Sequence, residues 1–190
     1  MVQMQTASKA EALVFAQTID IEDFLGLRHA ARQSILERKA LEKIIRELSS
    51  RSDLPEAKLR EAAVRWALGE DPAKTAIAGS KHPLALMIQA SACAAAKQHE
   101  KELELCERAA KDAPTDIACA MGQVSALRHL GRVGEALKRV ESLRREFSDH
   151  AEFAYQEGRC LEDAGEYAKA AVCYESAVTR NEDHYRAVFR

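Results

Sequence analysis

The sequence predicts an all-α protein built from stacked pairs of helices, and three observations support this prediction. Long runs of alternating β-branched or aromatic residues are absent, and so are Asn-Gly hairpin signals. The 190 residues include only four prolines and eight glycines, so long stretches can remain helical. A 34-residue repeat relates three segments of the C-terminal half, and repeats of this length are typical of stacked helical units.

The repeat becomes visible when the sequence is shifted by 34 residues against itself. Gly131 then falls on Gly165, and Ala136 falls on Ala170. One helix pair cannot bury its own apolar face, so units of this kind must stack on their neighbours. The shift divides the C-terminal part into three repeat units, which are residues 83–116, 117–150 and 151–184.

The sequence of each repeat unit predicts two helices joined by a short turn. In the last unit, we expect helices over residues 151–163 and 167–179. Gly165 lies between them, where a backbone with positive φ costs least for glycine. Pro114 follows the second helix of the first unit, because proline cannot continue the helical hydrogen-bond ladder.

These positions resemble the tetratricopeptide repeat (TPR) family. The unit 151–184 carries small, apolar and aromatic residues where that family has them, namely Gly158, Leu161, Gly165, Tyr167, Ala170, Tyr174 and Ala177. The middle unit keeps Leu127, Gly131 and Ala136, and the first keeps Ala90, Ala109 and Pro114. One departure is Glu102, which stands where the first unit would have alanine. The resemblance implies a right-handed α-α superhelix, a TPR-like solenoid.

The segment 1–82 shows no clear match to the 34-residue repeat but still reads as helical. It is interpreted as an N-terminal helical cap or as degenerate repeats, with an oligomerisation element as a further reading. We expect helices near residues 8–18, 21–50 (with a break near 31), 55–69 and 72–79. Asp53 is the expected N-cap of the third helix, with Pro55 near its first position and Gly69 at its end.

Residues 185–190 continue the phase of the repeat and read as the start of a truncated fourth repeat. A half-helix there would leave the apolar edge of the third unit uncovered, whereas solenoids normally end in a polar cap. We therefore expect the chain to be part of a longer protein.

Composition and motifs argue against several classes of function. The net charge of −2 disfavours nucleic acid as a partner, and no apolar run is long enough for membrane insertion. Five cysteines without a CxxC pair predict neither a disulfide framework nor a zinc site, so a reducing, cytoplasmic location is expected. The six histidines form no HxxxH or HExxH pair, and no phosphate-binding loop or GxSxG motif is present. We expect no catalytic residues, no metal and no cofactor, and hence no enzyme.

The TPR resemblance assigns the inner face of the superhelix to the first helix of each unit. At these positions the first unit has Leu84, Met87, Ile88 and Ser91, and the later units have Met121, Ser125, Arg128, Tyr155, Gln156 and Arg159. We predict that these ten residues form a partner-binding groove. The carboxylate clamp that some TPR proteins use for chaperone tails is absent, because Met87, Ser91, Gly122, Glu152 and Gln156 occupy its positions.

The apolar first part of this groove suits the apolar face of an amphipathic helix. Three occupants remain open: the N-terminal helices of this chain, a segment of a protein or peptide partner, or a second copy in a homo-oligomer. The sequence thus favours a protein–protein interaction scaffold or adaptor. The alternative is an N-terminal recruiting arm of a larger enzyme whose catalytic domain lies beyond residue 190.

Overall fold

The computed structural model describes residues 9–16, 18–51, 54, 56–75, 77–147 and 150–180. Within these ranges the chain forms α-helices, one 3-10 helix and no strand, which confirms the all-α prediction. The chain divides into two compact units, an N-terminal unit of residues 1–92 and a C-terminal unit of residues 93–190. Residues 185–190, the expected start of a fourth repeat, lie outside the described residues.

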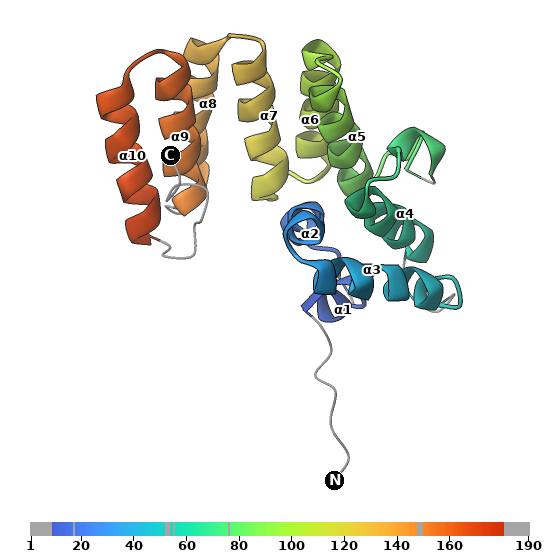
Figure 1. Cartoon of the computed structure of the whole chain (residues 1–190). Helices are drawn as coiled ribbons and strands as arrows, with labels where there is room; N and C mark the ends of the chain where they lie inside the picture. The colour runs from blue at the N-terminus through green and yellow to red at the C-terminus, as the bar shows by residue number, and fades with distance from the viewer. Residues whose placement is uncertain are drawn as a thin grey trace. The chain divides into compact units, whose positions relative to one another are not determined.

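The N-terminal unit packs four α-helices against one another and continues into a fifth. In Figure 1 they run from blue to green, and their bounds are α1 Lys9–Val14, α2 Ile21–Gln33, α3 Ile35–Leu48, α4 Ala57–Leu68 and α5 Pro83–Ala95, with the 3-10 helix η1 at Pro72–Lys74. Helix α4 contacts both α2 and α3, and α1 contacts α2 and α3. The core between them contains Phe24, Leu41, Ile44 and Val64, all fully buried.

One serine divides the long helix expected over residues 21–50. Ser34 ends α2 and begins α3 with an extended backbone, φ −129° and ψ 120°. Its Oγ accepts a hydrogen bond from the backbone N–H of Glu37 at 3.3 Å, which satisfies one of the free N–H groups of α3. The break therefore lies three residues after the expected position near 31.

Three other expected helix limits differ from the structure. Helix α1 is shorter than the predicted 8–18. The helix expected over 72–79 is only a 3-10 turn, in which Asp71 Oδ1 accepts from the N–H of Ala73 at 3.0 Å. Helix α4 has Glu56 at its N-cap, with φ 56°, while Asp53 and Pro55 lie outside the described residues. Gly69 ends α4 in the left-handed conformation, as predicted.

A buried arginine connects α4 to α1. The side chain of Arg60 is almost fully buried, and its Nη1 donates a hydrogen bond to the carbonyl of Val14 at 2.8 Å. Its guanidinium also lies 5.9 Å from the ring centroid of Phe24. Burial lowers the pKa of Arg60 from its usual value, because desolvation disfavours the charged form.

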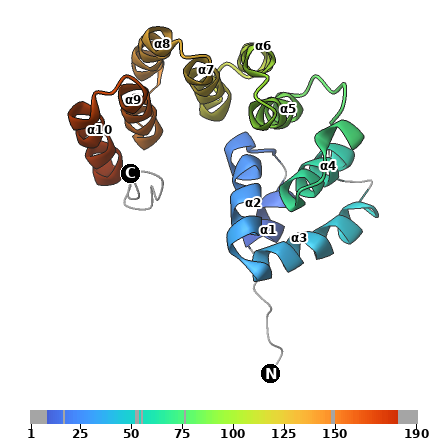
Figure 2. The same ribbon diagram turned by 45° about the horizontal axis from the view of Figure 1, so that its top comes forward.

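The C-terminal unit is a succession of helices in which each contacts the next along the chain. Figures 1 and 2 show this order from green to red, with bounds α6 His99–Asp112, α7 Ile117–His129, α8 Val133–Glu146, α9 Ala151–Asp163 and α10 Tyr167–Arg180. The helices expected over 151–163 and 167–179 agree with α9 and α10. Helix α7 also contacts α9, as the first helices of stacked pairs do.

Two glycines make the tight turns within the helix pairs. Gly131 between α7 and α8 has φ 72°, and Gly165 between α9 and α10 has φ 77°. A side chain at positive φ would be strained, so glycine is the least costly residue at both positions. The N–H groups that follow, of Arg132 and Glu166, donate back to the carbonyls of Leu127 and Leu161 and complete the helix ends.

Close packing of α9 on α10 depends on the absence of a side chain at Gly158. A Cβ built at this position would lie 2.5 Å from Cε1 and 2.7 Å from Cδ1 of Tyr174, which is closer than van der Waals contact allows. Tyr174 is itself buried with Tyr155 and Leu161 in the core between these helices. A preceding core joins α7 and α8 to Phe153 of α9. Each pair thus covers the apolar side of the next.

A membrane-crossing helix is not found among the described residues, where each helix is too short or too polar for that purpose.

We predict that Gly158→Ala lowers the free energy of unfolding by about 1–3 kcal/mol, because the added methyl group must displace the Tyr174 ring. Urea unfolding followed by circular dichroism measures the effect. The matched control is Gly134→Ala on α8, where a Cβ meets no atom within 4 Å. This control should gain up to about 1 kcal/mol from helix propensity. A Gly158→Ala protein as stable as the Gly134→Ala control would contradict the close approach of α9 to Tyr174.

Candidate partner-binding surface

Side chains of α7 and α9 share one face because they recur at helical spacing. Met121, Ser125 and Arg128 follow each other at intervals of four and three residues along α7, and Tyr155, Arg159 and Glu162 do the same along α9. Both helices begin with a side-chain cap. Asp116 Oδ1 accepts from the N–H of Cys119 at 2.8 Å, and His150 Nδ1 accepts from the N–H of Glu152 at 3.3 Å.

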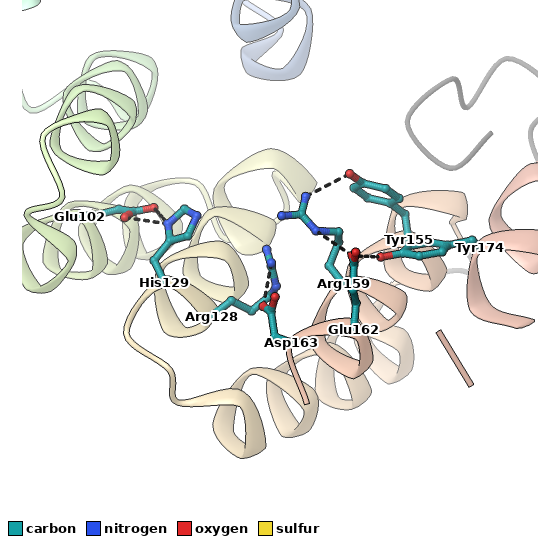
Figure 3. A network of polar contacts seen from close by, with 8 residues as sticks. All are labelled: Glu102, Arg128, His129, Tyr155, Arg159, Glu162, Asp163 and Tyr174. Atoms are coloured by element: carbon teal, nitrogen blue, oxygen red, sulfur yellow. Dashed lines mark hydrogen bonds and ion pairs between the residues drawn. The ribbon is translucent and has the colours of Figure 1, made fainter. Parts of the chain in front are cut away.

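A polar network covers the face of α9 (Figure 3). Arg159 Nη1 donates to the hydroxyl of Tyr155 at 3.2 Å, and its Nε lies 3.8 Å from Glu162 Oε2. The hydroxyl of Tyr174 on α10 donates to the same Glu162 oxygen at 2.7 Å. The rings of Tyr155 and Tyr174 lie 5.8 Å apart between centroids. Aromatic rings and charges are thus held in one fixed arrangement.

An ion pair joins α7 to α9. Arg128 Nη2 lies 2.7 Å from Asp163 Oδ2, and the two side chains are 4% and 35% exposed (Figure 3). The guanidinium is therefore nearly removed from water, while the carboxylate remains partly hydrated. A buried charge is expensive without a partner, so the pair fixes α7 against the end of α9.

Three polar atoms on this face are buried and lack a hydrogen bond among the described residues. They are Arg128 Nε, Gln156 Oε1 and Arg159 Nε. The amide group of Gln156 is half satisfied, because its Nε2 donates to Glu152 Oε1 at 2.7 Å. An unsatisfied buried donor or acceptor costs about 1–3 kcal/mol, so each such atom calls for a functional or structural reason.

Two stretches, residues 54–117 and 121–185, match the family described as tetratricopeptide repeat, and together they cover more than half of the chain. The chain belongs to the tetratricopeptide repeat family. No curated protein matches it significantly. The first TPR match begins at residue 54, within the segment 1–82 that the sequence left open between a helical cap and degenerate repeats.

TPR repeats generally mediate protein–protein interactions, and proteins of this family are typically non-enzymatic scaffolds. The division of the chain into segments 1–82 and 83–184 stays a prediction.

The ten predicted groove residues fall in both compact units. Leu84, Met87, Ile88 and Ser91 lie on α5 in the N-terminal unit, where the first three are buried. Ser91 is half-buried, and its Oγ donates to the carbonyl of Met87 at 3.0 Å. Helix α5 therefore exposes no apolar stripe at these positions.

The other six predicted TPR groove residues lie on α7 and α9 in the C-terminal unit. Met121, Arg128, Tyr155 and Gln156 are buried, whereas Ser125 and Arg159 are half-buried. Met121 also belongs to the core between α7 and α8. The exposed part of this face is therefore polar rather than apolar.

The cysteines of this TPR chain are poor nucleophiles. Burial raises the pKa of the Cys106 and Cys160 thiols to about 12 and raises that of Cys119 further. Burial also raises the pKa of Cys93 and Cys173. Since the thiolate is the reactive form, these protonated thiols act as small packing side chains.

A charged pocket of about 370 Å³ lies beside α4 and η1 in the N-terminal unit. Arg65 in its wall contacts Glu61 at 2.8 Å and Glu70 at 3.2 Å. The hydrogen bond that Arg65 donates to Glu61 raises the pKa of the arginine. Because Arg65 is already paired with two glutamates, its charge is not available to bind a ligand in this pocket.

One polar cluster of the TPR array was not predicted from the sequence. His99, Glu102 and His129 come together although they belong to different helices, α6 and α7. The sequence did contain one sign of this cluster, because Glu102 stands at a position where the TPR pattern has alanine. Histidine spacing alone could not reveal it, because residues 99 and 129 are 30 positions apart and meet only through the packing of α6 on α7.

We expect Asp163→Asn to lower the free energy of unfolding by about 1–2 kcal/mol, because it leaves the buried Arg128 guanidinium without a countercharge. Partial hydration of Asp163 keeps the effect below that of a fully buried pair. The matched control is Glu135→Gln, which breaks the exposed pair with Arg132. No measurable change is expected there, since exposed pairs contribute little. Equal effects of the two substitutions in thermal unfolding would contradict this assignment.

Proposed function

We propose that the chain is a protein-interaction scaffold that holds a partner segment along the first helices of its TPR pairs. Membership of the TPR family supports the general role. The observation that supports the location is the accessible polar part of this face, where Ser125 of α7 and Arg159 of α9 are only half-buried. The guanidinium of Arg159 can donate hydrogen bonds to the C=O groups of a peptide backbone.

The chemistry of this surface favours a polar segment over a purely apolar one. Arg159 supplies a half-buried guanidinium, which the hydroxyl and ring of the buried Tyr155 hold in position. Ser125 adds a small hydroxyl on the neighbouring helix. An amphipathic helix bound through Leu84, Met87 and Ile88 remains the sequence-based prediction for α5, but it would require these buried side chains to become accessible.

A suitable test avoids the buried positions. Substituting Met87 or Met121 would disturb the fold as well as any binding, because both are 5% exposed. Ser125 and Arg159 are half-buried. Substitutions at these two positions should leave the cores intact and therefore test binding at the surface itself.

We predict that peptides selected from a displayed random library on the unchanged chain lose affinity for Ser125→Arg and for Arg159→Glu. The expected loss is at least about tenfold in Kd, because the substitutions add bulk or reverse charge at the bound segment. Fluorescence anisotropy with labelled peptides measures it. Lys138→Glu, at an exposed position of α8, is the control and should bind normally. Peptides that bind all four proteins equally would place the interaction elsewhere.

A further inference from the structure

The carboxylate of Glu102 is buried at a position where TPR units usually have alanine. Its side chain is only 5% exposed. An ionised carboxylate removed from water needs a cation or strong hydrogen-bond donors. In the described part of the chain its ion-pair partners are two imidazoles, not a lysine or an arginine.

The two imidazoles reach this carboxylate from different TPR helices. His99 begins α6 one turn before Glu102, and its Nδ1 lies 3.0 Å from Oε2. His129 ends α7, and its Nδ1 lies 2.9 Å from Oε1 and 3.0 Å from Oε2 (Figure 3). The two rings are tilted by 38°, with centroids 5.0 Å apart.

This geometry is close to that of a three-ligand metal site. One ligand atom from each of the three residues lies within 4.8 Å of the others. Zn²⁺ binds imidazole nitrogen and carboxylate oxygen at about 2.0–2.2 Å in tetrahedral geometry, which separates neighbouring ligands by roughly 3.3 Å. The contacts of 2.9 and 3.0 Å would lengthen slightly around an ion, and ligand atoms separated by up to 4.8 Å would move closer together.

We propose that His99, Glu102 and His129 bind a divalent transition-metal ion of the zinc type at the contact between α6 and α7. Two imidazoles with one carboxylate suit zinc and its neighbours in the first transition row, whereas calcium and magnesium prefer oxygen ligands. The histidine side chains are 24% and 36% exposed, so an ion can enter from solvent. Three protein ligands leave a fourth position for water or a ligand atom of a partner.

The ligand atoms that converge at this site belong to His99, Glu102 and His129, and no cysteine is among them. The site is therefore assigned two imidazole nitrogens and one carboxylate.

The bound ion would connect the second helix of one TPR pair to the first helix of the next. It would therefore stabilise the seam between repeats 83–116 and 117–150. Because the unfolded chain does not hold the three ligands together, metal binding should raise the temperature of unfolding.

The test uses the full chain without an affinity tag, titrated with Zn²⁺ by calorimetry and with Co²⁺ by visible absorption. We expect one ion per chain and Co²⁺ absorption bands without a thiolate charge-transfer band. Glu102→Ala and His129→Asn should each weaken Zn²⁺ binding by about tenfold or more. His150→Asn is the control, because it removes a histidine of the same unit while asparagine can still cap α9.

Glu102→Ala restores the residue that the TPR pattern favours, so this variant should fold, and circular dichroism verifies it. If Glu102→Ala does not fold, the Zn²⁺ affinities of His129→Asn and His150→Asn are compared on their own to test the site. Absence of stoichiometric binding to the unchanged chain would overturn the proposal. A thiolate band, or equal affinities in the folded variants and the control, would overturn it as well.

Discussion

The C-terminal unit depends on how closely the two helices of a pair can approach. At Gly158 the backbone of α9 comes within contact distance of the Tyr174 ring, and any side chain there would hold the helices apart. The close approach lets Ala170 and Ala177 pack beneath the same seam. Once a pair is closed, its remaining apolar side must be covered by the next pair, which the core joining α7 and α8 to Phe153 achieves.

Polar groups buried in such a stack each depend on a specific partner from another helix. Arg60 of α4 relies on the carbonyl of Val14, and Arg128 of α7 relies on Asp163 of α9. Glu102 relies on two histidines, one of them on α7. In each case the polar side chain restricts the contact between helices more than apolar packing would, because a displaced charged group loses its partner while it remains buried away from water.

Local signals in the sequence were sufficient for the helices of the repeats. Gly165 and Gly131 act through their own backbone conformation, so the limits of α9 and α10 could be predicted closely. The N-terminal segment was harder. Ser34 could have been helical or a cap, and only the packing of α2 and α3 on α4 decides which. The residues 72–79 have only a weak propensity for the α-helix, and the structure has a short 3-10 helix at Pro72–Lys74 instead.

The candidate surface was predictable only as positions on a helical face. The repeat pattern places Ser125, Arg128 and Arg159 on that face, but it does not show that Met121 is buried in a core or that Arg128 is paired with Asp163. These properties depend on neighbouring helices. The cluster around Glu102 had one local sign, a charge at a small-residue position, while the identity of its partners required the three-dimensional contact of α6 with α7.

Four buried thiols are distributed over the helices α5, α6, α7 and α9, at Cys93, Cys106, Cys119 and Cys160. A modifying reagent reaches each of them only when its own helix separates from its neighbours. The rate at which each sulfur is alkylated would then report the free energy of that separation. The chain thus carries its own set of local probes, which could show whether the repeats open together or one at a time.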